Sequence, residues 1–272
     1  MKRSERLVAM THFILDRPKE LVSLPYFSEK FDSAKSSISE DLAIVNKMFR
    51  EEGIGYLETI AGAAGGVKYI PSYSKEYSLE FVQSLCEKLE DPERLLPGGY
   101  LFMSDILGDP KTTRDIGRLF ASAFHDQDID AIITVATKGI PLAYAVASYL
   151  NVPVVIARRD PKVTEGSTVS INYVSGSTRK IQTMVLTKRS LQQGARVCII
   201  DDFMKAGGTI NGMKNLLKEF DAEVAGIGVL AEAEDEDEER VVEDYLSLVQ
   251  IINADDRAQS IEVKPGNLLQ YL

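Results

Sequence analysis

Apolar residues in the first part of the chain recur every three or four positions, the period of an amphipathic helix. Pro18 ends the first such run, Ser23 is a natural N-cap for the second, and Gly53 ends the third. Alternating apolar and polar residues around a glycine-rich turn then predict a hairpin. The predicted elements are helices over residues 4–17, 23–31 and 34–52 and strands over residues 54–60 and 67–70.

After residue 73 the pattern changes to short, fully apolar runs that alternate with helical patterns. Such runs are typical of buried parallel strands with helices on both faces, so we expect an α/β domain with a mostly parallel sheet. Pro71-Ser72-Tyr73-Ser74 marks the boundary, which divides the chain into residues 1–73 and 74–272. The predicted strands are 101–103, 131–136, 154–157 and 197–200, the predicted helices are 79–89, 114–124 and one opening at Pro141, and a hairpin pattern occupies 168–173 and 181–185.

The N-terminal order of helix, short helix, longer helix and hairpin is that of a winged helix-turn-helix. In this class the start of the third helix contacts base edges, so the sequence predicts a DNA-binding domain. The alternative is a three-helix module for protein interaction or dimerisation. The candidate DNA contacts are Lys2, Arg3 and Arg6 in an N-terminal arm, Lys35, Ser36, Ser37 and Ser39 at the start of the third helix, and Lys68 on the wing.

Charge and composition narrow these expectations. The net charge is −10, which argues against a surface that coats nucleic acid broadly. Residues 1–73 carry ten basic and ten acidic residues, so DNA binding there needs a local basic face or two paired subunits. The acidic run Glu232–Glu239 is expected to be a solvated loop and helix start.

Membrane and secretory signals are missing from the pattern. No apolar run approaches the roughly 20 residues of a membrane span, and no apolar block follows the basic N-terminus as in a signal peptide. Cys86 and Cys198 have no metal-ligand spacing, and Cys198 lies inside a buried strand pattern. We therefore expect a cytoplasmic protein with reduced cysteines and no metal site.

The segment Val197–Thr209 carries the clearest chemical signal. Four apolar residues lead into Asp201 and Asp202, and Gly207-Gly208-Thr209 then opens a helix over residues 210–220. Glycines let a turn aim backbone N–H groups at a phosphate, with the helix N-terminus behind them. Carboxylates beside such a turn suit sugar hydroxyls or Mg²⁺, and a ribose 5-phosphate satisfies both demands. The alternative is an ordinary strand-turn-helix junction with solvated aspartates.

A second loop has the same position at the end of a strand. Thr137-Lys138-Gly139 follows the apolar run Ala131–Ala136 and precedes Pro141 at the first helical turn. Backbone donors and one cation therefore lie at the carboxyl end of a parallel strand, where open α/β sheets bind ligands.

The Asp-Asp and Gly-Gly-Thr segment resembles the phosphoribosyl pyrophosphate (PRPP) motif of type I phosphoribosyltransferases. The resemblance implies that Asp201 and Asp202 take the ribose hydroxyls, that the loop after them wraps the 5-phosphate, and that the Thr137 loop holds pyrophosphate. It also implies a flexible lid at the hairpin between Asp160 and Lys188. The effector contacts so implied are Thr137, Lys138, Gly139, Asp201, Asp202, Phe203, Met204, Lys205, Ala206, Gly207, Gly208 and Thr209, with Arg158, Arg159 and Lys162 as further cations and Tyr100 as a ring that covers the site or packs in a core or interface.

The two parts together resemble the bacterial purine-operon repressor family over the whole chain. That resemblance implies a homodimeric DNA-binding repressor of purine synthesis genes in which PRPP, in a non-catalytic pocket, relieves repression. Lys205 stands where hypoxanthine-type transferases place an acidic residue beside the base, so no catalytic residue is expected. Mg²⁺ alongside PRPP is left open, and a guanine polyphosphate nucleotide is expected to compete for the pocket. The alternatives are an active purine phosphoribosyltransferase with an N-terminal oligomerisation module, and an RNA-binding attenuator.

Overall fold

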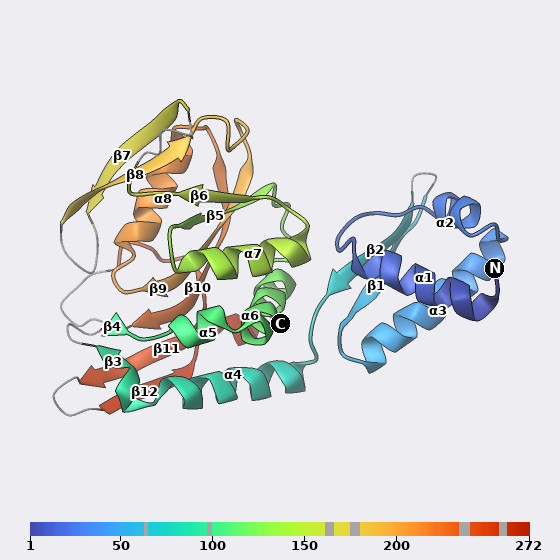
Figure 1. Ribbon diagram of the computed structural model, residues 1–272, viewed down its shortest axis with the longest axis horizontal. Helices are drawn as coiled ribbons and strands as arrows, with labels where there is room; N and C mark the ends of the chain where they lie inside the picture. The colour runs from blue at the N-terminus through green and yellow to red at the C-terminus, as the bar shows by residue number, and fades with distance from the viewer. Residues whose placement is uncertain (63–64, 97–99, 161–165, 175–179, 234–239, 256–259) are drawn as a thin grey trace. The chain divides into compact units, whose positions relative to one another are not determined.

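The N-terminal unit is three helices followed by a two-stranded antiparallel hairpin (Figure 1). In this computed structural model the described residues are 1–62, 65–96, 100–160, 166–174, 180–233, 240–255 and 260–272. The chain divides into two compact units, one of residues 1–74 with 148–151 and one of residues 75–147 with 152–272. The elements of the first unit are α1 (Arg3–Leu15), α2 (Leu24–Lys30), α3 (Lys35–Glu51), β1 (Gly55–Ile60) and β2 (Gly66–Pro71).

These bounds confirm the three predicted helices and the hairpin. The Ser23 hydroxyl caps α2 by accepting a hydrogen bond from the Tyr26 backbone N–H at 3.3 Å. Helical periodicity brings Met10, Phe27 and Ile38 together, and all three side chains are fully buried. A core of its own makes this unit an independent platform for the exposed start of α3.

The second unit is built on a six-stranded sheet in the order β12-β11-β10-β9-β5-β6. All neighbouring strands are parallel except β12, which runs antiparallel to β11 at the edge. The strands of this sheet are β5 (Ala131–Val135), β6 (Val154–Ala157), β9 (Arg196–Met204), β10 (Glu223–Ala233), β11 (Leu246–Asp255) and β12 (Ser260–Pro265).

Helices cover both faces of the sheet, as the fully apolar strands require. Ile133 and Ile199 point to the face on which α8 packs, while Gly228 on the other face lets the Phe120 ring of α6 lie against the strand. The helices are α4 (Lys75–Leu89), α5 (Ser104–Gly108), α6 (Pro110–Ala123), α7 (Gly139–Leu150) and α8 (Gly208–Lys218), with short 3₁₀ turns η1 (Pro92–Arg94) and η3 (Asn267–Tyr271).

Two small hairpins complete the unit. The predicted hairpin is present as β7 (Thr168–Val174) and β8 (Ile181–Thr187), and its Tyr173 and Met184 side chains are buried beside Gly212 of α8. This inner face therefore anchors the hairpin to α8, and its expected role as a flexible lid stays a prediction. The other hairpin is β3 (Leu95–Leu96) with β4 (Tyr100–Leu101).

The predicted strand 101–103 is wrong beyond Leu101. Met103 is instead the N-cap of α5, because the chain turns around the Arg94 guanidinium. Arg94 donates to the Phe102 carbonyl at 3.0 Å and pairs with both carboxylate oxygens of Asp105. The helix expected at Pro141 begins at Gly139.

Candidate ligand pocket and nucleic-acid interface

A cavity of about 570 Å³ lies where the carboxyl ends of β5, β6 and β9 meet. It collects the two loops that the sequence singled out, and open parallel sheets bind ligands at this edge. Its lining residues are Leu101, Met103, Val135, Ala136, Thr137, Lys138, Arg158, Arg159, Asp160 and the continuous run from Asp201 to Ile210.

Asp201 and Asp202 are adjacent carboxylates in the last part of the central strand β9. Asp201 is only 5% exposed, and burial followed by the neighbouring Asp202 charge raises its pKa well above the ordinary value. Burial also raises the pKa of Asp202, partly offset by the Lys138 charge. The Asp202 backbone N–H donates to Asp201 Oδ1 at 3.1 Å. A group that donates hydrogen bonds to both carboxylates would therefore relieve an unfavourable charge arrangement.

The loop after this pair turns into α8 through Gly207, which is the N-cap and has φ +84°. Only glycine adopts this backbone without strain, and a Cβ here would lie 2.9 Å from Cγ2 of Val242. The turn points the first amides of α8 toward the cavity edge, where Gly208 and Thr209 are part of the lining. The start of a helix, with its backbone amides and the positive end of the helix dipole, is chemically suited to an anion.

The Thr137 loop faces the carboxylate pair across the cavity. Thr137 and Lys138 are exposed, whereas Gly139 is buried, and a Cβ at Gly139 would lie 2.2 Å from Thr134 Oγ1 and 3.3 Å from Asp201 Oδ1. Glycine is thus required for the loop to approach β9. The Ala136–Thr137 peptide bond is cis.

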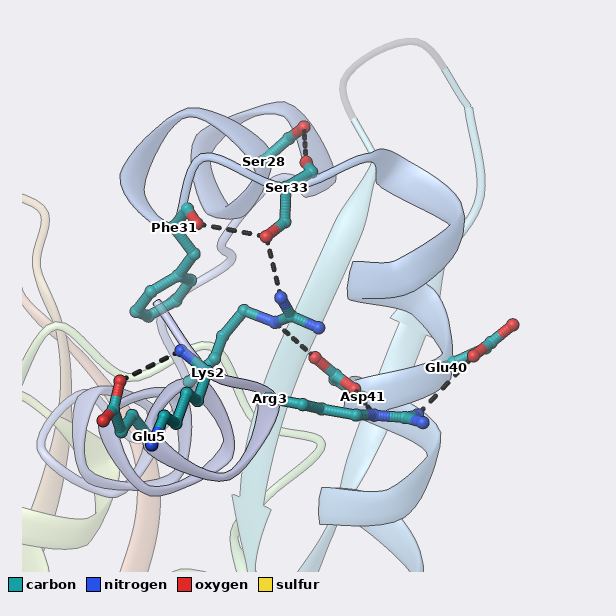
Figure 2. Close-up of polar contacts among 9 residues, drawn as sticks. Lys2, Arg3, Glu5, Ser28, Phe31, Ser33, Glu40 and Asp41 are labelled. Atoms are coloured by element: carbon teal, nitrogen blue, oxygen red, sulfur yellow. Dashed lines mark hydrogen bonds and ion pairs between the residues drawn. The ribbon is translucent and has the colours of Figure 1, made fainter.

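In the N-terminal unit, a buried carboxylate ties α1 to α3 (Figure 2). Asp41 of α3 is fully buried and accepts from Arg3 Nε at 2.8 Å and from Arg6 Nε at 2.6 Å. Arg6 also donates through Nη1 to the Ser33 hydroxyl at 2.8 Å, which connects the turn before α3 to the same cluster. This Asp41 clamp therefore sets the position of α3 relative to α1 and to the preceding turn.

The clamp corrects the expectation of an N-terminal arm. Arg3 and Arg6 lie in the first turns of α1, and the Arg6 side chain is only 11% exposed. Lys2 precedes the helix and is exposed, with its backbone N–H donating to Glu5 at 3.0 Å. Lys68 on the wing pairs with Glu58 across the hairpin at 3.0 Å. At the start of α3, Lys35, Ser36 and Ser39 are exposed and Ser37 is half-buried.

Comparison with known proteins assigns both units. Residues 2–71 match the N-terminal domain of the bacterial purine repressor, and residues 103–265 match the phosphoribosyl transferase domain. The purine biosynthesis transcriptional repressor PurR of Bacillus subtilis (strain 168) is 60% identical, over 99% of this chain and 94% of its own length. The chain belongs to the PurR family of purine biosynthesis transcriptional regulators.

Members of the PurR family carry different signs of regulation. The purine biosynthesis transcriptional activator PurR of Lactococcus lactis subsp. lactis (strain IL1403) is 47% identical over 98% of both chains. Among solved structures, adenine phosphoribosyltransferase from Rhodothermus marinus DSM 4252 aligns with a TM-score of 0.50 and 21% identity, covering 57% of this chain and 88% of that one. That likeness shows the fold of the second unit. Together with the two domain matches it confirms the predicted fold class.

This PurR-family pocket brings most of the predicted contacts together. Thr137, Lys138, Arg158 and every residue from Asp201 to Thr209 line the cavity, and Gly139 lies directly behind it. The side chain of Tyr100 and all of Lys162 lie outside the described residues. The apolar wall of Leu101 and Met103 was missed because local pattern assigns them to a strand, and Asp160 was missed because a lone acid after a strand has no distinctive signal.

Two further findings concern whole-chain properties. Among the residues that the structure describes, no helix combines the length and the apolar run that a membrane crossing requires. The acidic run is not a solvated segment from its start, because Glu232 belongs to β10 and is 4% exposed. Residues 234–239 of that run lie outside the described ranges.

Proposed function

We propose that this PurR-family chain is a DNA-binding repressor of purine biosynthesis genes whose pocket binds PRPP without catalysis, and that PRPP relieves repression. The observation that carries the proposal is the pair of the buried Asp201 and the half-buried Asp202, which line the same cavity as the Gly207 turn at the N-terminus of α8. This arrangement sits in a chain that also carries a helix-turn-helix unit with an exposed third-helix start.

The chemistry of PRPP fits the three parts of the cavity. The ribose hydroxyls donate to Asp201 and Asp202, which favours the ionised carboxylates that burial disfavours. The 5-phosphate accepts from the amides of residues 205–209 at the start of α8. Lys138 and Arg158 supply positive charge for the pyrophosphate. Where Mg²⁺ accompanies PRPP, Asp201 and Asp202 are the residues that would hold it, and it would neutralise phosphate charge, because carboxylate oxygens are among its preferred ligands.

Lys205 supports a sensor rather than a transferase. It lies in the cavity lining at the position where hypoxanthine-type transferases carry an acidic residue that manages a proton of the base. An ammonium group cannot accept that proton, and its charge favours phosphate binding. A complete pocket also suits an active purine phosphoribosyltransferase, so formation of nucleotide from PRPP and each common purine base is the discriminating assay.

DNA binding is proposed for two copies of the chain on a pseudo-palindromic operator. The N-terminal unit carries equal numbers of acidic and basic residues, so one copy gains little from phosphate contacts alone. A homodimer doubles the basic contacts and presents two α3 helices to successive major grooves.

The decisive experiment measures binding of the purified chain to DNA upstream of purine synthesis genes at fixed salt, with increasing PRPP. We expect specific binding that PRPP weakens. Binding that PRPP strengthens would make the chain an activator-like member of the family, and binding no tighter than to unrelated DNA would refute the repressor proposal. A guanine polyphosphate nucleotide should displace PRPP in a competition titration, and failure to displace it would dismiss that competitor.

A further inference from the structure

The proposed phosphate-binding turn at Ala206 and Gly207 contacts a segment that has no part in the proposed ligand chemistry. This segment follows the acidic run and comprises Arg240, Val241, Val242 and Tyr245, with Glu232 of β10 as its anchor. We call these five residues the brace. They lie in the same unit as the cavity, and none of them is among its lining residues.

The brace touches the turn at two points. The Val241 backbone N–H donates to the Ala206 carbonyl at 3.1 Å. The Val242 side chain is 2% exposed and fills the space next to Gly207, where Cγ2 lies 2.9 Å from the position of a Cβ. The first contact holds the carbonyl side of the turn, so the amides of the next residues are left for the cavity.

Glu232 holds the brace in place. One carboxylate oxygen accepts from the Arg240 guanidinium at 2.6 Å and from the Tyr245 hydroxyl, and the other accepts from Ser247 Oγ at 2.7 Å. Arg240 also reaches the Ala233 carbonyl at 3.3 Å and bonds the Tyr245 hydroxyl. A buried carboxylate with this many donors is fully satisfied, which makes it a rigid attachment point.

Strand register places this anchor beside the turn. Glu232 pairs with Met204 at the ends of β10 and β9, one residue before Lys205. Burial, followed by the hydrogen bond to Glu232 and the Glu232 charge, raises the pKa of the Tyr245 phenol, so the hydroxyl remains a donor at neutral pH. The anchor, the brace and the turn thus form one connected unit.

From this geometry we infer that Glu232 and Val242 are positioning residues for the phosphate-binding turn, acting through the backbone at Ala206 and Gly207. The inference rests on the proposed function only for the identity of the ligand, since any 5-phosphate of a ribose would meet the same amides. It gives the first residue of the acidic run a role as an anchor, distinct from the carboxylates that face the cavity.

The test compares Glu232→Gln and Val242→Ala with the unaltered chain, and uses Glu243→Gln as a matched control because Glu243 is exposed and outside the brace. Calorimetric titrations with PRPP, ribose 5-phosphate and pyrophosphate separate the parts of the cavity. We expect both brace variants to bind PRPP and ribose 5-phosphate on the order of tenfold more weakly, the lower end of the loss seen when the outer-shell support of metal ligands is removed. Pyrophosphate binding and the Glu243→Gln control should not change.

Equal loss for all three ligands would indicate general disruption and overturn the inference, as would unchanged affinity for ribose 5-phosphate. Hydrogen exchange of the ligand-free proteins provides a second readout, in which the amides of residues 206–209 should exchange faster in both brace variants only. If the unaltered chain binds no PRPP, the proposed function fails, and this exchange result alone decides the brace. Unchanged exchange at residues 206–209 then overturns it.

Discussion

Three buried carboxylates show how the same chemical group serves two purposes in this chain. Asp41 and Glu232 each accept from arginine side chains, at 2.6 to 2.8 Å, and both are integral to their local structure. Asp201 is similarly buried, but the neighbouring Asp202 carboxylate raises its pKa by more than the Arg159 charge lowers it. Carboxylates paired with arginine stabilise a fold, whereas two adjacent carboxylates whose ionised forms burial disfavours are expected where a ligand supplies further donors.

Replacement of Asp201 by Asn should therefore stabilise the ligand-free protein and abolish PRPP binding. The pKa of Asp201 is raised in the folded state, so ionisation at neutral pH costs folding free energy, and the amide removes this cost. We expect the melting temperature to rise by a few degrees at pH 7, since 1 kcal/mol corresponds to roughly 2–4 °C in a domain of this size.

The pH dependence gives the sign of this effect. The wild-type protein gains stability as the pH falls through the raised folded-state pKa, because Asp201 then becomes protonated and neutral. The advantage of Asp201→Asn should shrink over that interval and vanish near the ordinary pKa of 3.8. Thermal unfolding between pH 7 and pH 4 measures this difference in stability. If Asp201→Asn were less stable than the wild type at pH 7, the ionised Asp201 would not destabilise the ligand-free protein, which would contradict our interpretation.

Arg6 should behave in the opposite way. Arg6→Ala leaves the buried Asp41 without its closest partner, so we expect a loss of about 3 kcal/mol in the unfolding free energy of the N-terminal unit. Arg6→Lys should recover only part of it, because one ammonium cannot span both Asp41 and Ser33 as the guanidinium does. Denaturant unfolding measures both.

The matched control is Lys47→Ala, which removes a cation that is 72% exposed and pairs with Glu51 at 3.6 Å on the same helix. Its cost should stay below about 0.5 kcal/mol. Equal stability of Arg6→Ala and Lys47→Ala would show that the Asp41 clamp contributes nothing.

At the scale of elements, local pattern predicted most of the chain. The three N-terminal helices and their hairpin, the strands of residues 131–135, 154–157 and 196–204, and the β7–β8 hairpin follow from periodicity and from turn residues. The observed ends of these elements differ from the predicted ones where a tertiary contact determines where the element ends. Met103 is not part of the expected strand, because Arg94, nine positions earlier, donates a hydrogen bond to the carbonyl of Phe102 and the chain turns there.

Contacts between distant elements could not be read from the sequence. An aspartate at position 41 of an amphipathic helix is normally solvated, and only the fold brings it to Arg6, 35 positions earlier. The burial of Glu232 could not be predicted either, since its acidic neighbours in the sequence indicate the start of an exposed run. The cavity was predictable to a larger extent, because the carboxyl ends of adjacent parallel strands must converge and Asp201, Asp202 and the Thr137 loop all lie at such ends.

The exposed start of α3 is the part of the chain that we expect to contact DNA. Lys35 is exposed at the first helical position, so Lys35→Ala should weaken binding to operator and unrelated DNA alike. Loss of one phosphate contact per subunit lowers the slope of log K against log salt by about 1 for each contact. Filter binding across a salt series measures the slope. Lys218→Ala, an exposed cation at the end of α8, serves as the control and should leave it unchanged.

A loss confined to one sequence, with an unchanged slope, would instead make Lys35 a base contact. An unaltered affinity would move the DNA interface away from the start of α3. The Asp41 clamp enters here as well, because Arg6→Ala should widen the range of DNA sequences bound at temperatures where the unit is still folded.

On the scale of the whole molecule, the chain joins a purine-repressor N-terminal domain to a phosphoribosyltransferase-type domain with a cavity, and the proposed regulation requires an energetic connection between them. The family contains both a protein named as a repressor and one named as an activator at 60% and 47% identity to this chain. The same two units therefore support both signs of output. If a pocket ligand regulates DNA binding as proposed, the sign lies in which conformation that ligand favours rather than in the pocket chemistry itself.

Thermodynamic linkage makes this connection measurable from either unit. If PRPP weakens operator binding by a given factor, operator DNA must weaken PRPP binding by the same factor, typically about 5-fold to 150-fold. We expect calorimetric titrations of PRPP with and without saturating operator to give that factor, and Asp201→Asn to eliminate the response of DNA binding to PRPP while leaving DNA affinity itself intact. A single PRPP affinity in both titrations would show that the pocket and the DNA interface are energetically independent. In that case the pocket would have to serve a separate activity, and the transferase assay with each purine base would identify it.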